Sequence, residues 1–223
     1  MKYIYLNILL IIFSLNINAG APAPSTSLPE PPYVFEKGTL ITAEVNWNKD
    51  SIQKYLPSDI KLDEIINGSI EVFFTRHEKP LAKINYVLIW LKLQNNHKKL
   101  ILGFVGPNYD SNRIIEKISE KKLTLAKSRL MLINQKVSLR TNINNKLSFN
   151  ISGTINTECK NTNNKSDIIE INKSKTFSIT HKSDSACNIE GTNIIFTEKY
   201  SDIKINKILN ASIFENAKVT FSY

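Results

Sequence analysis

The stretch LPEPPYVFEKGTLITAEVNWNKDSIQKYLPSDI, residues 28–60, decides the fold. After a proline-stiffened start, apolar and polar side chains alternate along residues 40–47, and this two-residue period predicts a half-buried β-strand. Asn48 or Asp50 can cap the helical turn that follows, because short polar side chains accept hydrogen bonds from free backbone N–H groups. Pro57 ends that turn, since a proline forces the preceding residue out of the α region. We therefore expect an extended lead-in, a first strand and a short helix.

The composition bounds the class of protein. At 223 residues, with 42% hydrophobic residues, the chain is long enough for one domain with a sizeable core. Its 29 basic residues outnumber 20 acidic ones, which gives a formal net charge of +9. The lysines are scattered, and no basic cluster alternates with aromatic residues. The surplus charge therefore does not predict a nucleic-acid partner.

The N-terminus has the layout of a secretory signal peptide. Lys2 supplies a positive charge, residues 3–17 form an apolar core, and Ala19 offers a small residue for cleavage. The apolar run is short for a membrane-spanning helix, although an uncleaved anchor remains an alternative. We expect residues 1–19 to be removed and the mature protein to be periplasmic or secreted, without a stable membrane span after processing.

The remaining chain predicts one mostly β domain. Residues 20–33 are rich in Pro, Ala and Ser and predict an extended lead-in to a domain spanning 34–223. A helix is expected from about residue 110, because Ile114 and Ile118 share one face with the isoleucine between them. Short alternating runs joined by Asn- and Gly-rich turns predict an α+β fold, mostly β, with an antiparallel sheet or closed barrel and one or two helices. The expected strands beyond the first are 68–76, 82–94, 99–105, 123–133, 136–143, 146–155, 176–181, 193–200 and 217–223.

Two cysteines, Cys159 and Cys187, are present and can form a disulfide across a polar loop if the protein is exported. Closing a loop of that length stabilises the fold by roughly 3 kcal/mol, and two free thiols are the less favoured alternative. His77, His97 and His181 lie beside charged neighbours without metal-ligand spacing, so we expect them to be mostly solvated and predict no metal site.

Both ends of the chain resemble the acetoacetate decarboxylase family. Residues 28–60 match its order of Pro-Pro-Tyr, first strand, helical turn and Leu-Pro step, and residues 204–223 (KINKILNASIFENAKVTFSY) resemble its closing strand–turn–strand. The resemblance covers about two-thirds of the mature chain. It implies an acetoacetate decarboxylase-like fold, a small keto-acid or carbonyl ligand, lysine-imine chemistry without a cofactor, and a homo-oligomer.

The family's reactive lysine belongs to a Pro-Lys-Lys-Leu run followed by an Ala-x-x-Arg-Leu strand. This chain has EKKL at 120–123 and AKSRL at 126–130, so joining the two halves requires two residues, Thr124 and Leu125, that the family pattern lacks. A bulge can absorb them, whereas a gapless pairing leaves no lysine at the reactive position. Glu120 also replaces the proline, and its negative charge stabilises an ammonium group.

The resemblance implies that Lys122 forms the imine and that Lys121 lowers its pKa. An amine attacks a ketone only when unprotonated, so burial or a neighbouring cation must lower its pKa. The protein would then be a decarboxylase (a carboxy-lyase) of small β-keto acids. The alternatives are a solvated helix end at these lysines, a binding module without turnover, and an envelope protein that keeps only the fold.

Other polar positions of the family have changed in this chain. The family has an arginine in the first strand region, where this chain offers Trp47 and Asn48, and a glutamate in the third, where residues 82–94 carry no carboxylate. Tyr86, Trp47 and Trp90 lie on apolar strands, and we expect them in the core rather than stacked on a ligand.

Overall fold

The computed structural model describes residues 30–58, 60, 62–75, 84–93, 97–107, 109–119, 121–161, 165–172 and 175–222. The predicted signal peptide, most of the lead-in and His77 lie outside these residues. The first strand, β1 (Tyr33–Trp47), forms where the alternating pattern predicts it. Helix α2 (Lys49–Gln53) follows, and the Asn48 side chain caps it by accepting a hydrogen bond from the Ser51 N–H at 3.1 Å. Within residues 30–58, the first strand and the short helix therefore form as predicted.

The remaining elements are mostly strands, in agreement with the predicted α+β, mostly β class. They are β2 (Ile66–Thr75), β3 (Asn85–Lys92), β4 (His97–Val105), α3 (Tyr109–Ser119), β5 (Thr124–Leu125), β6 (Lys127–Ile133), β7 (Lys136–Ile143), β8 (Lys146–Ile155), β9 (Lys160–Asn161), β10 (Lys165–Asn172), β11 (Lys175–Lys182), β12 (Ser185–Phe196), the 3-10 turn η3 (Glu198–Tyr200) and β13 (Ile205–Ser222).

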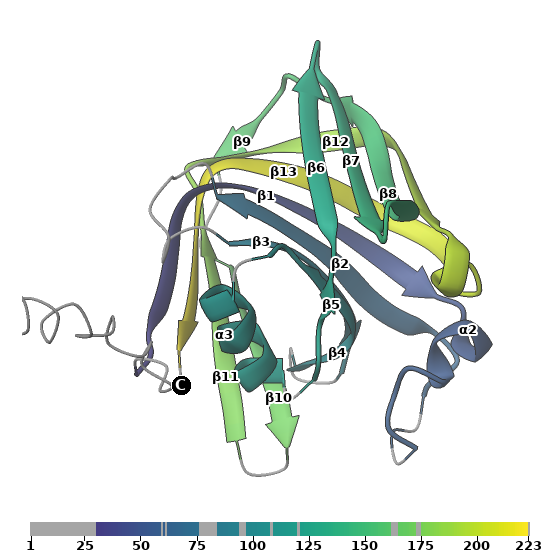
Figure 1. Ribbon diagram of the computed structural model, residues 1–223. Helices are drawn as coiled ribbons and strands as arrows, with labels where there is room; N and C mark the ends of the chain where they lie inside the picture. The colour runs from purple at the N-terminus through teal and green to yellow at the C-terminus, as the bar shows by residue number, and fades with distance from the viewer. Residues whose placement is uncertain are drawn as a thin grey trace, which may run out of the picture.

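The sheet closes on itself over part of its width. Its strand order runs β1-β2-β3-β4-β10-β11-β13, and β13 also pairs with β1 along most of their length, which completes the ring. The sheet then continues from β13 through β12, β8 and β7 to β6. Figure 1 shows α3 lying within the curve of the ring, in front of the strands. The ring and its helix match the closed, barrel-like fold expected from the resemblance.

Two apolar cores fill the molecule, one on each face of the ring. Helix α3 closes the inner core with Ile114, Ile115 and Ile118, the face predicted from their spacing. The outer core lies between the ring and the β6-β7-β8-β12 part of the sheet. Trp90 and Tyr86 are buried in the inner core and Trp47 in the outer one, as expected of core residues.

Strand β13 corrects the predicted strand–turn–strand ending, because it is one continuous strand. It pairs with β12 through residues 212–214 and with β11 through residues 218–222, so it joins the two parts of the sheet. Between these regions Asn216 has a φ of 52°, and on β1 Lys37 has a φ of 55° beside a register shift. Such irregularities bend a strand sharply. The bend replaces the turn that the Asn-rich sequence suggested.

A second correction concerns the region between the cysteines. This polar stretch, in which only residues 176–181 were predicted as a strand, forms the hairpin β10–β11, which completes the ring between β4 and β13; β11 confirms the predicted strand and β10 was not predicted. In the described part of the chain, no helix has the length and apolar character needed to span a membrane.

Candidate functional site

The two predicted lysines follow α3, and their side chains lie in different environments. Lys122 is exposed, whereas Lys121 is half-buried. The Lys121 Nζ donates hydrogen bonds to the backbone carbonyls of Tyr55 at 2.8 Å, Leu100 at 3.3 Å and Ile101. The ammonium therefore connects the end of the α2 region to strand β4.

The edge of β4 explains why carbonyls converge on Lys121. β4 pairs with β10 at residues 97–98 and with β5 at residues 104–105, and Lys121 bonds the edge between these two partners. In the same region Trp90 of β3 faces Leu100 while Ile89 faces Leu102, so Ile101 is an extra residue in β4. A bulge of this kind leaves backbone groups outside the ladder that need other partners. The Lys121 ammonium supplies that partner.

The environment of Lys121 lowers the pKa of its amine. Burial is the main cause, because it disfavours the charged form, and the nearby positive charge of Lys99 adds to it. These are the conditions that imine formation requires. The sequence analysis assigned the imine to Lys122, with Lys121 as the neighbouring cation. In the structure the lowered pKa belongs to Lys121, and Lys99 is the neighbouring cation.

The hydrogen bonds of Lys121 act in the opposite direction. An ammonium carries three donors, and three carbonyls accept from it here. A neutral amine has two N–H donors, so losing a proton leaves one of these carbonyls facing a lone pair. Reaction at this nitrogen requires it to move away from at least one carbonyl.

Two residues of the predicted motif form a separate element. Thr124 and Leu125, which the family pattern lacks, make the short strand β5 along the edge of β4. They are therefore accommodated before β6 and not as a bulge within it. The backbone between Lys121 and β5 is fixed by Glu116, whose Oε1 accepts a hydrogen bond from the Leu123 N–H at 2.9 Å.

A second group of ionisable residues lies inside the ring, where sequence reasoning did not place one. Glu71 of β2 is 1% exposed, and its Oε1 accepts a hydrogen bond from the Tyr86 hydroxyl at 2.6 Å. His181 Nε2 of β11 lies 3.1 Å from the same oxygen, at ion-pair distance but outside good hydrogen-bond geometry. Lys98 of β4 is also buried and acts on Glu71 through its charge. We call these four residues the Glu71 cluster.

The cluster keeps Glu71 ionised. Burial alone raises the pKa of this carboxyl, but the close contact with His181, the charge of Lys98 and the hydrogen bond from Tyr86 together outweigh burial and lower the pKa to about 2. Burial and the adjacent carboxylate raise the pKa of the Tyr86 hydroxyl. The expectation that His181 is solvated is wrong, because the side chain is buried against Glu71. The signal that could have revealed the cluster is a glutamate in the middle of the apolar run GSIEVFFT.

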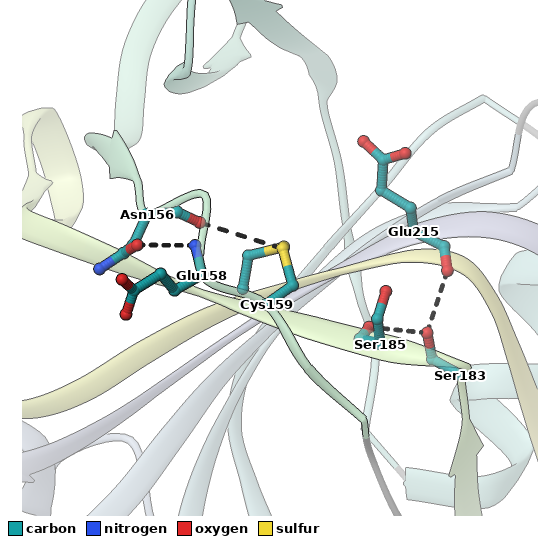
Figure 2. The surroundings of a disulfide bond; sticks show 7 residues. Asn156, Glu158, Cys159, Ser183, Ser185 and Glu215 are labelled. Atoms are coloured by element: carbon teal, nitrogen blue, oxygen red, sulfur yellow. Dashed lines mark hydrogen bonds between the residues drawn. A yellow bond between two sulfur atoms is a disulfide. The ribbon is translucent and has the colours of Figure 1, made fainter.

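Cys159 and Cys187 form a disulfide with an S–S distance of 1.99 Å, and the bond links residues on either side of the β10–β11 hairpin. Figure 2 shows its surroundings, where the Ser183 hydroxyl donates to the carbonyls of Ser185 at 3.1 Å and Glu215 at 3.0 Å. The disulfide therefore ties the segment before the hairpin that carries His181 to β12, and Ser183, directly after the hairpin, bonds to β13.

The comparisons with known proteins identify the fold. No protein-family profile matches the sequence, and no curated protein matches it significantly. Among solved structures, an acetoacetate decarboxylase from Legionella pneumophila has a TM-score of 0.63 and 13% identity, covering 94% of this chain and 93% of that chain.

Two other structures show the same similarity. The enduracididine biosynthesis enzyme MppR complexed with pyruvate has a TM-score of 0.61 and 8% identity, covering 89% of this chain and 91% of that chain. An acetoacetate decarboxylase-like enzyme from Sphingomonas wittichii RW1 has a TM-score of 0.57 and 10% identity, covering 92% and 96%. This chain therefore has an acetoacetate decarboxylase-like fold, as the sequence resemblance implies.

Proposed function

We propose that this protein is an acetoacetate decarboxylase-like enzyme that forms an imine between Lys121 and a small β-keto acid or related carbonyl compound. The observation that carries the proposal is the half-buried Lys121 amine with a lowered pKa, which begins the KKL run that precedes the AxxRL motif. Perturbed pKa values concentrate at functional sites, which supports the assignment. Similarity to an enzyme that was solved with pyruvate supports a small carbonyl ligand.

The proposed reaction uses Lys121 as an electron sink. The neutral amine attacks the ketone carbon, and loss of water gives an imine that is protonated at nitrogen. The bond between the α-carbon and the carboxylate then breaks, carbon dioxide leaves, and the electron pair moves to the iminium nitrogen to give an enamine. A proton adds to the α-carbon, and water hydrolyses the imine to release the ketone and the amine. This sequence balances without a cofactor.

We also propose that the protein acts outside the cytoplasm, after export by residues 1–19. The disulfide between Cys159 and Cys187 supports this location, because such bonds persist in oxidising compartments. A homo-oligomer remains an expectation drawn from the resemblance.

The experiment that tests the imine is reductive trapping followed by peptide mass mapping. The protein is incubated with acetoacetate and sodium borohydride, and each lysine is examined for the added mass. We expect one adduct on Lys121, absent in Lys121→Arg and retained in Lys122→Arg, which is the matched control at the exposed neighbour. Trapping at Lys121 should increase with pH and reach half its maximum at a lower pH than trapping at exposed lysines. The reason is that a lowered pKa allows the neutral amine to form at a lower pH.

Three other results would contradict an imine at Lys121. An adduct on Lys122 alone would restore the original assignment, and adducts scattered over exposed lysines would reject an imine enzyme. Binding without any adduct or carbon dioxide release would favour a binding module without turnover. The observation that supports this second function is the set of three carbonyls that accept from the Lys121 ammonium, because these hydrogen bonds oppose the proton loss that imine formation requires.

A further inference from the structure

The outward side of the β6–β7 hairpin carries a group of exposed cations. Residues 121–157, which include both strands, contain lysines and arginines but no aspartate or glutamate. Leu130 of β6 and Leu139 of β7 lie opposite each other and pack into the outer core. Because side chains alternate along a strand, their neighbours project from the opposite side of the sheet. The four exposed cations on that side are Lys127, Arg129, Lys136 and Arg140.

Two of these cations form a like-charged pair. Arg129 lies directly opposite Arg140 in the antiparallel ladder, an arrangement in which the Cβ atoms are about 5 Å apart. Like charges placed in this way destabilise a sheet. In the described part of the chain, none of the four cations forms an ion pair with a carboxylate. The fold therefore keeps a repulsive pair without a counter-ion, and an anionic partner would relieve that repulsion.

Exposed apolar side chains lie on the same side of the sheet as the cations. Ile133 is 63% exposed and lies opposite Lys136 at the end of the hairpin. Ile195 of β12 is 42% exposed and pairs with Asn150 of β8, which pairs in turn with Arg140. We call the four cations together with Ile133 and Ile195 the basic face. It combines positive charge with apolar side chains that are exposed to water.

The end of the hairpin is a tight turn. Asn134 and Gln135 have φ angles of 48° and 63°, and two successive positive φ angles are typical of a two-residue type I′ turn. The turn holds Ile133 and Lys136 opposite each other on the two strands, and Figure 1 shows it at the top of the molecule, beyond the ring. An apolar side chain and a cation are therefore presented together at a projecting point of the molecule.

The composition of the basic face favours a lipid surface over a nucleic acid. Proteins that bind single strands stack bases on aromatic side chains, but Phe149 is the only aromatic residue in β6, β7 and β8, and it is fully buried. Exposed isoleucines gain nothing from phosphates in water, whereas they leave water when they enter the interface of a bilayer. A second copy is also disfavoured, because a symmetric contact would bring the cations of one copy against those of the other.

We propose that the basic face docks on the surface of a bilayer that contains anionic phospholipids. The four cations lie at the level of the lipid phosphates, and Ile133 enters the boundary between the head groups and the acyl chains. Each cation near such a surface strengthens binding about fivefold. This attachment is peripheral and requires no spanning helix. It does not involve Lys121, so it stands or falls separately from the proposed imine chemistry.

The proposal is tested with a fluorescent label at the end of the hairpin. Both cysteines of the chain form the disulfide, so only the cysteine introduced by Ile133→Cys takes an environment-sensitive label such as NBD. The labelled full chain is mixed with vesicles of phosphatidylcholine and phosphatidylglycerol, or of phosphatidylcholine only. We expect a saturable blue shift with the anionic vesicles, which is lost at high salt because screening weakens the attraction.

The label reports on its own surroundings, so insertion of the apolar residues 3–17 into a bilayer does not by itself produce the shift. A second position checks this point. Ile65, directly before β2, is 70% exposed and does not belong to the basic face. The same label at Ile65→Cys should not shift with either kind of vesicle.

Two double variants separate docking from net charge. Arg129→Gln/Arg140→Gln should weaken binding to the anionic vesicles about 30-fold, since it removes two cations of the basic face. Lys204→Gln/Lys207→Gln is the matched control, because it removes the same charge from exposed lysines near the start of β13, and it should have little effect. The arginine variant should keep or raise the thermal midpoint, because it removes a like-charged pair from the sheet.

Three kinds of result overturn the proposal. If the label at Ile133→Cys does not shift with anionic vesicles, or shifts equally with phosphatidylcholine only, the basic face does not recognise anionic lipid. If the two double variants weaken binding equally, net charge and not this face is responsible. If the shift appears without vesicles as the protein concentration rises, or with a DNA oligonucleotide and not with vesicles, the occupant is a second copy or a nucleic acid.

Discussion

Glu71 and Lys121 are both charged groups removed from water, but the fold compensates them differently. Glu71 has His181 and Lys98 as cations and the Tyr86 hydroxyl as donor, and its pKa falls to about 2. Lys121 has carbonyl oxygens and a like charge, Lys99, nearby, and its pKa falls as well. For a carboxyl a lower pKa means a more stable charge, whereas for an amine it means a less stable one.

The comparison shows where this protein can keep a reactive group. The partners of Glu71 inside the ring favour its ionised form. At Lys121, neutral dipoles replace a counter-ion, so the charged form is not fully compensated. A nucleophilic amine is therefore expected at Lys121 and not within the ion-paired cluster.

The largest effect is predicted for Glu71→Ala. Removing the carboxylate leaves the Tyr86 hydroxyl without its acceptor and His181 without the oxygen it contacts, and breaking a buried pair in this way costs about 3–5 kcal/mol. A domain of this size would lose about 6–20 °C in thermal midpoint, measured by calorimetry at neutral pH. Glu71→Gln, which keeps the size of the side chain and an acceptor for Tyr86, should lose less. Equal losses would mean that packing, and not charge, dominates at this site.

The pH dependence provides a second check on Glu71. Its pKa is lowered from 4.5 to about 2, so its stabilising contribution is present above pH 4.5 and is lost as the pH falls toward 2. The unfolded chain binds this proton first, which pulls the equilibrium toward unfolding. The difference in stability between the wild type and Glu71→Gln should therefore shrink between these pH values. A constant difference would contradict the ion pair.

The next largest effect is predicted for the disulfide, which tests how the ring holds His181 against Glu71. Cys159 and Cys187 are separated by 28 residues, and opening such a loop costs about 3 kcal/mol in the chain-entropy picture. The double variant Cys159→Ser/Cys187→Ser should unfold at lower denaturant concentration. If the position of the hairpin depends on the disulfide, the loss of stability caused by Glu71→Gln should be smaller in the double cysteine variant than in the wild type. Fully additive losses would show that β10–β11 holds its position independently.

Much of the fold was accessible from local sequence patterns. The alternation in residues 40–47, the Asn48 cap and the apolar face of α3 depend on neighbours along the chain, and each formed as predicted. Strand β10 was missed because its sequence is largely polar, and the place of the β10–β11 hairpin in the ring depends on β4 and β13, which are distant in sequence. Similarly, periodicity cannot show that β13 bends and changes partners.

The candidate site was predictable to a smaller extent. The motif indicated a lysine pair as the candidate, but exposure distinguishes Lys121 from Lys122, and Lys121 bonds to carbonyls at a bulge in β4 that no local pattern indicated. The Glu71 cluster was missed because its members come from four strands: β2, β3, β4 and β11. His181 has charged neighbours in the sequence, which predicts a solvated side chain. Only the closed ring places it against the Glu71 carboxylate.

The smallest effect in this series is predicted for Lys121→Met, and the sign of its pH dependence is the most informative result. Methionine retains much of the apolar stem of the lysine side chain. It leaves the carbonyls of Tyr55 and Leu100 without this donor, which lowers stability by about 1–3 kcal/mol. It also removes a poorly compensated charge, which offsets part of that loss. Lys121→Arg keeps the donors and serves as the control. We expect a net loss of about 1 kcal/mol for Lys121→Met in denaturant unfolding at neutral pH.

The sign of this variant's pH dependence tests whether Lys121 can act as a nucleophile. Because the folded-state pKa is lowered from 10.5, the unfolded chain binds more protons as the pH approaches that value, and stability rises with pH where the unfolded state binds more protons. The advantage of the wild type over Lys121→Met should therefore grow as the pH is raised toward 10.5. If it shrinks instead, the carbonyls stabilise the ammonium more than burial and Lys99 destabilise it. Lys121 would then be a structural clamp for the edge of β4, and the imine chemistry would lose its nucleophile.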